Sequence, residues 1–386
     1  MKMKTYNDLF EKIVDVNNIK AAIHEAARHK RKKRAVRHAL ATEDRLANRI
    51  SEWLKNDCWR PVDIHDCTLI NDGINLKKRL IVCPSFVQEQ IIHHAIMRVV
   101  YPLFAKKFYR YSCGSVKGKG SEFAKDYIQK KIRRKKGETK YAVKIDIKKF
   151  FNTVRPSFVF RELRRTIRDR RTLWLLALIL RGNKMRVYED DLQYTTGLKV
   201  IKKDKKGRCV VKGGLPIGFY TSPIFANILL DRLDHFVKET LHAPLYVRYM
   251  DDILIMSGNK RKLQAYCEAI ARFLENISLS LKSKPAIHKF GEQSRAVDFM
   301  GFVFSRIKTI IRDKVFLRTM RILRKIAKKI RINRFDTSRV ISMAGRFKNA
   351  DMRAAFSRHF LSVVSIKACR RIVSQAAKRG QLKCSM

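Results

Sequence analysis

Hydrophobic positions recur at helical spacing near both ends of the chain and form shorter, β-prone runs between them. Apolar residues three and four positions apart predict helices over residues 6–54, 88–104, 156–181, 221–241 and 262–274. The segment 63–84 instead alternates around Asn71-Asp72-Gly73, which is typical of a tight hairpin turn. Long helices thus alternate with shorter β-prone segments.

Short runs rich in β-branched and aromatic residues lie between these helices. They predict strands within residues 141–147, 245–256, 279–282, 287–290 and 297–304. A polar, β-prone excursion at 188–212 contains the turn sequence KKDKKG at 202–207. From residue 317 the pattern is helical and basic to the end.

Charge changes this picture more than any other property. Among 386 residues, 86 are Lys or Arg and 34 are Asp or Glu, which gives a formal net charge of +52. Such a balance indicates a polyanionic partner. A hydrophobic content of 46% allows a packed core and excludes wholesale disorder. The eight cysteines form no CxxC motif, so we expect neither a zinc site nor a disulfide framework.

No segment predicts a membrane span. The longest purely apolar run, 173–180, is bounded by Arg171 and Arg181, whereas a spanning helix needs roughly 18–20 residues. The charged start of the sequence lacks the apolar centre of a secretory signal. We therefore expect a cytoplasmic protein.

The informative acids are those within apolar, β-prone sequence. Asp146 lies in KIDI, and Asp251 and Asp252 lie in YMDDILI, whereas Asp190-Asp191 has no apolar frame and is typical of a turn. Two aspartates at a hairpin bend, beside a third at a strand end, would repel one another unless cations neutralised them, and such oxygen ligands suit Mg²⁺ or Mn²⁺. Two such ions, about 3.5–4 Å apart, support nucleotidyl transfer.

Five motifs in order carry a resemblance to a known family. KIDIKKFF at 144–151, GLPIGFYTSPIFANILL at 214–230, YMDD at 249–252, LSLK at 279–282 and DFMGF at 298–302 resemble the palm motifs of reverse transcriptases. The resemblance covers roughly residues 60–305. It implies an α+β fold, the right-hand polymerase of fingers, palm and thumb, with an antiparallel palm sheet and a helical basic thumb.

The resemblance implies the metal ligands. Asp146, Asp251 and Asp252 correspond to the family's catalytic carboxylates, and the main-chain carbonyl of Ile147 would be an extra ligand for two Mg²⁺ or Mn²⁺ ions. Phe151 would collide with a ribose 2′-hydroxyl and so select deoxynucleotides, although core packing beside Phe150 is the alternative.

The resemblance also implies substrate-binding residues. Gly218 would let the backbone approach the template–nucleotide pair, and Lys282 would lie near the departing pyrophosphate. Arg79 would contact the triphosphate, and Tyr249 belongs to the YMDD motif. Val116 replaces an arginine usual in relatives, and Lys117 or Lys119 could substitute for it.

Three parts are predicted along the chain. Residues 1–60 form a basic helical extension, 61–305 form fingers and palm, and 306–386 form a basic helical thumb. Finger elements lie mainly in 61–140, with an insertion at 188–212. The extension and the thumb are the predicted RNA surfaces, where binding should weaken with salt.

The resemblance extends to bacterial enzymes of diversity-generating retroelements and, nearly equally, to antiphage defence reverse transcriptases. Both imply a bacterial enzyme that uses dNTPs to copy a dedicated structured noncoding RNA into cDNA, with an accessory protein or a homo-oligomer as further partners. Against the first group, Ser222-Pro223 stands where Ser-Gln is usual. One alternative is a catalytically silent RNA-binding protein on a polymerase-like scaffold. The other is an RNA-directed RNA polymerase, which the expected exclusion of a ribose 2′-hydroxyl by Phe151 disfavours.

Overall fold

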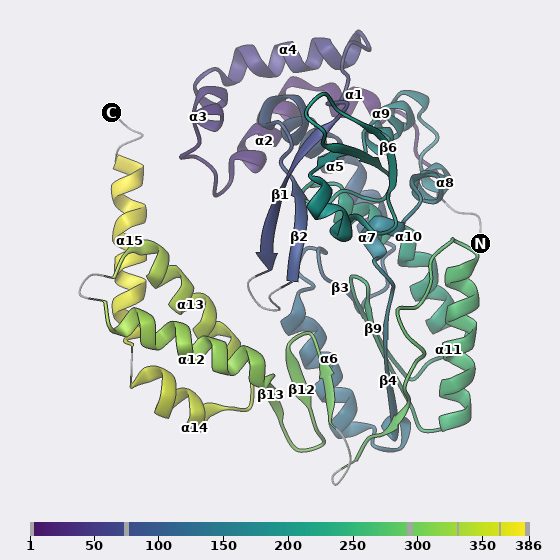
Figure 1. The fold of residues 1–386 in the computed structure, drawn as a ribbon, viewed down its shortest axis with the longest axis vertical. Coiled ribbons are helices and arrows are strands. Elements are labelled where there is room, and N and C mark those ends of the chain that lie inside the picture. The colour runs from purple at the N-terminus through teal and green to yellow at the C-terminus, as the bar shows by residue number, and fades with distance from the viewer. Residues whose placement is uncertain (1–3, 73–76, 292–295, 330–331, 363, 383–386) are drawn as a thin grey trace. The chain divides into compact units, whose positions relative to one another are not determined.

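The computed structural model describes residues 4–72, 77–291, 296–329, 332–362 and 364–382 (Figure 1). The chain divides into two compact units. The first consists of Met1–Gly120, Ile145–Ile253 and Gln264–Pro285. The second consists of Ser121–Lys144, Leu254–Leu263 and Ala286–Met386. All the residues predicted to form the active site belong to the first unit, whereas the boundaries predicted at residues 60 and 305 stay predictions.

The first unit begins with four helices, within the segment 6–54 that the sequence predicts to be helical. They are α1 (Phe10–Val14), α2 (Val16–Ala27), α3 (Arg34–Ala41) and α4 (Glu43–Lys55). In α2 the buried residues Ile19, Ala22, Ile23 and Ala26 are spaced three or four apart, so they form one apolar face. That face packs against α5 (Ile91–Ala105), which follows the π-helical turn η1 (Phe86–Gln90).

One carboxylate joins the start of the chain to a distant helix. Asp169 caps α9 (Arg170–Arg181) by accepting a hydrogen bond from the backbone N–H of Thr172 at 3.1 Å. It also accepts from the N–H groups of Leu9 at 2.8 Å and Phe10 at 2.7 Å. Burial opposes ionisation, but these donors outweigh it and lower the pKa of Asp169. The α8 helix (Pro156–Thr166) precedes α9.

A five-stranded sheet contains both the predicted hairpin and the predicted insertion. Its order is β2-β1-β5-β7-β6. The strands are β1 (His65–Asp72), β2 (Lys77–Val82), β5 (Lys184–Val187), β6 (Lys199–Lys203) and β7 (Cys209–Lys212). The tip of the β1–β2 hairpin at 73–76 lies outside the described residues. Beneath the sheet, Val82, Met185, Val187, Val211 and Phe219 form one apolar cluster.

The insertion has the turn that the sequence predicts. After η3 (Glu189–Thr195), strands β6 and β7 flank a tight turn in which Asp204 accepts hydrogen bonds from the N–H groups of Lys206 and Arg208 at 2.9 and 3.0 Å. Every residue of β6 is exposed. β6 is therefore an open sheet edge.

A second five-stranded sheet carries the YMDD motif, in the order β10-β4-β9-β8-β3. The strands are β3 (Ser112–Cys113), β4 (Tyr141–Asp146), β8 (Leu245–Tyr249), β9 (Asp252–Ser257) and β10 (His288–Lys289). β3 pairs with β8 in parallel, so the sheet is not antiparallel throughout.

The strand expected at 279–282 does not form as such among the described residues. Only a bridge joins Leu281 to Ile147 there. Lys149 has a φ of 45°, which turns the chain after β4 into α7 (Phe150–Thr153) and ends the ladder.

A largely buried helix packs against β3 and α8. α10 (Ser222–His235) has Pro223 in its first turn, where a missing N–H is tolerated, and it continues into the π-helical turn η4 (Phe236–Thr240). Ile224, Phe225, Ile228 and Leu229 are all buried, so the helix belongs to the core. α11 (Lys260–Glu275) follows the YMDD hairpin.

The second unit is mostly helical and basic. Its elements are α6 (Ser121–Arg134), η2 (Gly137–Thr139), β11 (Val297–Phe299), β12 (Phe302–Phe304), β13 (Thr309–Ile311), α12 (Asp313–Ala327), α13 (Arg334–Lys348), α14 (Arg353–Phe356), η5 (Ser357–Leu361) and α15 (Ile366–Leu382). α13 packs against both α12 and α15 (Figure 1). The buried Arg306 donates to the carbonyls of Ile132 at 2.8 Å and Thr139 at 2.7 Å. This arginine thus fixes the end of α6 within the unit.

None of the helices in the described part of the chain is long and apolar enough to cross a lipid bilayer.

Candidate active site

The YMDD motif forms the bend between β8 and β9, as predicted. Tyr249 ends β8, Asp252 begins β9, and Met250 between them has a φ of 56°. A left-handed methionine is uncommon because its Cβ crowds the backbone. The bend leaves Asp251 and Asp252 half-buried. It therefore presents two adjacent carboxylates at the end of the hairpin.

Asp146 lies beside this bend, at the end of the neighbouring strand β4. The N–H of Ile147, the next residue, donates a hydrogen bond to the carbonyl of Asp251 at 3.4 Å. Burial raises the pKa of Asp251, and the negative charges of Asp252 and Asp146 raise it further, while Arg79 opposes them. The three aspartates thus interact electrostatically although about a hundred residues separate Asp146 from the pair.

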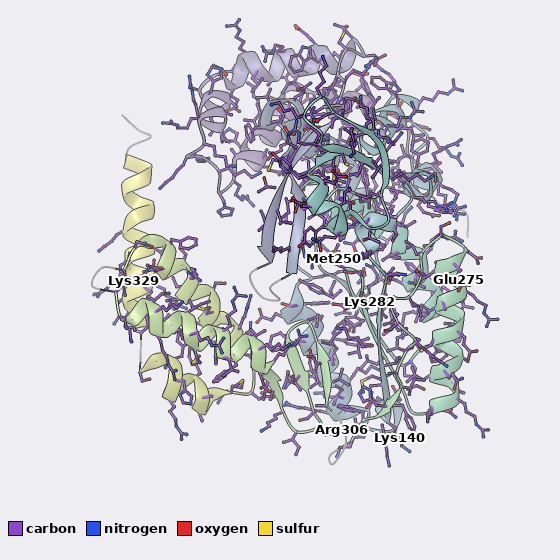
Figure 2. The ribbon with its side chains drawn as sticks, in the orientation of Figure 1. Lys140, Met250, Glu275, Lys282, Arg306 and Lys329 are labelled. Atoms are coloured by element: carbon purple, nitrogen blue, oxygen red, sulfur yellow. The ribbon has the colours of Figure 1, made fainter. Side chains whose placement is uncertain are left out.

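Lys282 completes the acidic cluster with a positive charge. Its Nζ donates to Oδ2 of Asp146 at 2.5 Å, and its backbone N–H donates to the Asp146 carbonyl at 2.9 Å. The hydrogen bond to Asp146 raises the pKa of Lys282, and the charges of Asp146, Asp252 and Asp251 add to that shift. Figure 2 labels Lys282 and Met250 of the YMDD bend.

The cluster has the donor atoms that magnesium prefers. Three carboxylates and the Ile147 carbonyl are hard oxygen ligands, and the mutual repulsion at Asp251 is what a divalent cation would relieve. Within the described residues, no three His, Cys, Asp or Glu side chains are arranged as a metal site. Here the ammonium group of Lys282 supplies the countercharge to Asp146. The residues therefore have the chemistry that the predicted ions require. One of the ligands, Asp146, forms an ion pair with Lys282 in this structure.

Phe151 lies where the motif after Asp146 meets the glycine-rich motif. Its carbonyl accepts a hydrogen bond from the N–H of Leu215 at 2.6 Å. The neighbouring Phe150 is buried, whereas Phe151 is half-buried and contacts Phe150 edge to face, with ring centroids 5.5 Å apart. Phe150 therefore fills the core position, and Phe151 keeps part of its surface free.

Gly218 packs closely against the backbone of Val82, at the end of β2. Its φ is 119°, and an added Cβ would lie 2.1 Å from the carbonyl oxygen of Val82. The N–H of Val82 in turn donates to the carbonyl of Ile217 at 2.8 Å. The absence of a side chain is thus needed to join this motif to β2, a reason that the sequence did not reveal.

The two predicted finger cations differ in their surroundings. Arg79 is exposed on β2, opposite Ile70 on β1, and its charge acts on Asp251. Lys117 is exposed on a loop, and its backbone N–H donates a hydrogen bond to the Tyr101 hydroxyl at 3.1 Å. Val116, where relatives carry arginine, is buried. The structure brings Arg79 into electrostatic contact with the acidic cluster and gives Lys117 no such contact among the described residues.

Sequence reasoning missed one buried charge behind the YMDD bend. Arg248 is fully buried and pairs with the equally buried Asp234 of α10. The available signal was a charged residue within LYVRY, an otherwise apolar strand directly before the motif.

Comparison with known proteins agrees with this geometry. Residues 71–304 match the family described as reverse transcriptase (RNA-dependent DNA polymerase), and the chain belongs to that family. It has the α+β polymerase fold that the motifs predict.

Among individual proteins, the retron Ec73 reverse transcriptase of Escherichia coli is 28% identical over 152 residues, which cover 38% of this chain and 41% of that protein. Among solved structures, apo telomerase from Candida tropicalis aligns with a TM-score of 0.48 at 13% identity, covering 79% of this chain and 56% of that one. Telomerase from Candida albicans in complex with a fragment of telomeric RNA gives 0.43 at 14% identity, covering 77% and 55%. The chain thus spans about two-fifths of the curated relative and just over half of each telomerase chain.

Proposed function

We propose that this chain is an RNA-directed DNA polymerase that uses dNTPs to synthesise cDNA on an RNA template in the bacterial cytoplasm. The observation that carries the proposal is the pairing of Ile147 with Asp251, because it joins the motif of Asp146 to the YMDD bend. Family membership supports the same reaction.

Asp146, Asp251 and Asp252, with the Ile147 carbonyl, are the residues that would hold two Mg²⁺ or Mn²⁺ ions. When bound, such ions activate the primer 3′-hydroxyl and stabilise the triphosphate during in-line displacement. Repulsion at Asp251 and the partial exposure of all three carboxylates support this role.

The remaining predicted residues have roles around the nucleotide. Arg79 contacts the triphosphate, and its charge already acts at Asp251. Lys282 stabilises the departing pyrophosphate after releasing Asp146. Phe151 excludes a 2′-hydroxyl, and Gly218 and Tyr249 border the template–nucleotide pair. Lys117 stays a candidate for a more distant phosphate.

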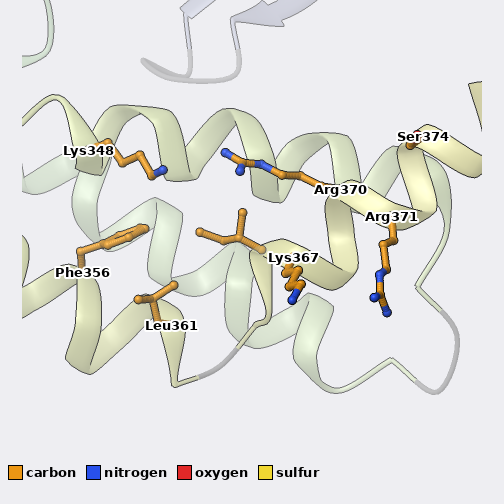
Figure 3. A pocket seen from close by; sticks show the side chains of 8 residues that line it. Lys348, Phe356, Leu361, Lys367, Arg370, Arg371 and Ser374 are labelled. Atoms are coloured by element: carbon orange, nitrogen blue, oxygen red, sulfur yellow. The ribbon is translucent and has the colours of Figure 1, made fainter.

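The template in this proposal is a dedicated structured noncoding RNA. The net charge of +52 supports a long-lived RNA partner better than brief contact with a primer and template. A pocket of about 670 Å³ in the second unit is one surface for it (Figure 3). Lys348, Lys367, Arg370 and Arg371 line it together with the apolar Phe356 and Leu361, which suits a backbone phosphate beside an unstacked base.

The catalytic assignment is tested by primer extension on primed RNA with dNTPs and Mg²⁺. Asp251→Asn with Asp252→Asn should abolish incorporation while RNA binding persists. The matched control is Asp190→Asn with Asp191→Asn, because that pair lies in η3 outside the site and should leave incorporation unchanged. Robust synthesis by the first variant would remove these residues from the mechanism. Tight RNA binding without incorporation by the wild-type chain would favour a silent RNA-binding protein.

The RNA partner is tested separately. Arg370→Gln with Arg371→Gln should weaken binding of the copurified RNA and flatten its salt dependence, since two phosphate contacts are lost. Unchanged affinity would exclude the pocket as an RNA surface.

The system served by the enzyme is a diversity-generating retroelement or an antiphage defence system. Sequencing the copurified RNA and its DNA product distinguishes the two systems. Adenine-mutagenised copies of a repeat would indicate diversity generation, and repetitive DNA induced by phage would indicate defence. The same preparation would reveal an accessory protein or a homo-oligomer.

A further inference from the structure

Arg248 is a charged side chain that folding has removed completely from solvent. It lies on β8, two residues before Met250, and both it and its partner Asp234 have no exposed side-chain surface. The pair is bidentate: Nε donates to Oδ1 of Asp234 at 2.7 Å, and Nη2 donates to Oδ2 at 2.6 Å. The desolvation cost of a buried ion pair can exceed its attraction, so stability alone is a poor reason for its presence.

The rest of the guanidinium group reaches the YMDD bend. Nη1 donates to the carbonyl oxygen of Met250 at 3.0 Å and to Oδ1 of Asn227 at 2.9 Å. Nη2 also donates to the Ser112 hydroxyl at 2.5 Å. The Met250 carbonyl belongs to the peptide group that leads into Asp251, so this hydrogen bond holds the backbone directly before the first acid of the pair.

The bend is held from a second side by backbone. The N–H of Met250 donates to the carbonyl of Cys113 at 3.1 Å. Gly114 follows, with a φ of 84°, and its Cβ, were there one, would lie 3.0 Å from Cγ of Met250. Asn227, whose side-chain oxygen accepts from Arg248, donates through its side-chain amide to the Gly114 carbonyl at 3.0 Å. Both sides of the left-handed Met250 are therefore tied to one buried polar network.

We propose that Arg248 is a positioning residue that holds the Met250 carbonyl, and through it the carboxylates of Asp251 and Asp252, in the geometry that metal binding and nucleotidyl transfer require. This inference rests on the proposed catalytic role of the two aspartates. Lysine cannot replace arginine here, because a single ammonium group cannot bind both Asp234 oxygens and also reach Met250 and Asn227.

The chain supplies a control within the same network. The hydroxyl of the buried Tyr246 donates to Oδ1 of Asp234 at 2.6 Å, and in the described part of the chain no hydrogen bond joins it to Met250. Tyr246→Phe thus perturbs the same buried carboxylate while leaving the bond from Arg248 to the bend in place. Asn227→Ala is a second variant that leaves both charges intact. It removes one acceptor from the nitrogen that also serves Met250, together with the hydrogen bond to the Gly114 carbonyl.

The test compares Arg248→Lys, Asn227→Ala and Tyr246→Phe at a temperature at which circular dichroism shows each to be folded. Single-nucleotide incorporation is measured per folded molecule, across a Mg²⁺ titration. Arg248→Lys should lower kcat by about tenfold to a hundredfold, raise the half-saturating Mg²⁺ concentration by about tenfold and leave KM for primer–template unchanged. Asn227→Ala should shift both quantities in the same direction by less. Tyr246→Phe should lower Tm and change neither.

The outcomes separate this inference from the catalytic assignment. If Arg248→Lys and Asn227→Ala keep the wild-type kcat and Mg²⁺ response while the Asp251 and Asp252 variants are inactive, the positioning role alone is wrong. If activity merely follows Tm across all three variants, the network is only structural. If Arg248→Lys fails to fold, a wild-type Mg²⁺ response in Asn227→Ala overturns the inference.

Discussion

The ammonium group of Lys282 binds the carboxylate of Asp146 at 2.5 Å, across 136 residues of sequence. The resemblance assigned these two residues to different tasks, the lysine to the leaving pyrophosphate and the aspartate to a metal. On the proposed roles, an ion held by Asp146 would compete with Lys282 for this carboxylate, and a released Lys282 would be available to the phosphates.

Lys282→Gln should therefore lower kcat for single-nucleotide incorporation by about tenfold to a hundredfold, because a cation near the developing charge is lost. It should also lower the half-saturating Mg²⁺ concentration, since the competitor for Asp146 is gone. Lys284→Gln is the matched control, because Lys284 is exposed two residues away. Equal rates for both variants would limit Lys282 to balancing the charge of Asp146.

Phe151→Ala should raise incorporation of ribonucleotides relative to deoxynucleotides by about tenfold or more, because the half-buried ring no longer excludes a 2′-hydroxyl. The measurement is the ratio of kcat/KM for matched rNTP and dNTP pairs. Phe150→Leu, which alters the buried neighbour, should reduce stability without changing this ratio. An unchanged ratio in Phe151→Ala would support the core-packing interpretation.

Gly218→Ala should destabilise the chain by about 2 kcal/mol or more, because a side chain is strained at a φ of 119° and collides with the Val82 carbonyl. Denaturant unfolding measures the loss. Gly120→Ala is the control, because nothing lies within 4 Å of its added Cβ. If the two variants unfold alike, the contact between the Gly218 loop and β2 is absent in solution.

The buried His93 should make the free energy of unfolding depend on pH. It is buried on α5, with its ring edge to face against Phe219 at 5.2 Å, and burial lowers its pKa from 6.5 to about 4. The charge of Glu89 raises the pKa of His93, whereas His65 and His94 lower it further. Burial likewise lowers the pKa of His94 to about 4.

Because the unfolded chain binds the His93 proton more readily, the free energy of unfolding should fall as pH drops from 6.5 towards 4. His93→Leu should remove roughly 2–3 kcal/mol of this decline, as measured by denaturant unfolding at several pH values. A wild-type slope in the His93 variant would contradict the lowered pKa.

The sequence predicted what local pattern determines. The apolar frame around Asp251 and Asp252 indicated a hairpin with acids at its bend, and the bend forms there. Asp146 could be placed at a strand end for the same reason. Contacts between distant segments could not be predicted. The approach of Gly218 to Val82 and the pairing of Arg248 with Asp234 depend on tertiary packing, and hydrophobic periodicity carries no record of either. The strand expected at 279–282 had the right composition, but a turn at Lys149 leaves it little to pair with.

The open edge at β6 has a consequence for handling the protein. Val200 and Ile201 are 54% and 46% exposed there, between Lys199 and the lysines at 202 and 203. An uncovered strand with apolar side chains is a template for pairing with another copy, and flanking lysines oppose that by repulsion. Reagents that neutralise amines, such as acetylating agents, should therefore cause aggregation through this strand. High salt should also promote aggregation, because it screens the repulsion between the flanking lysines.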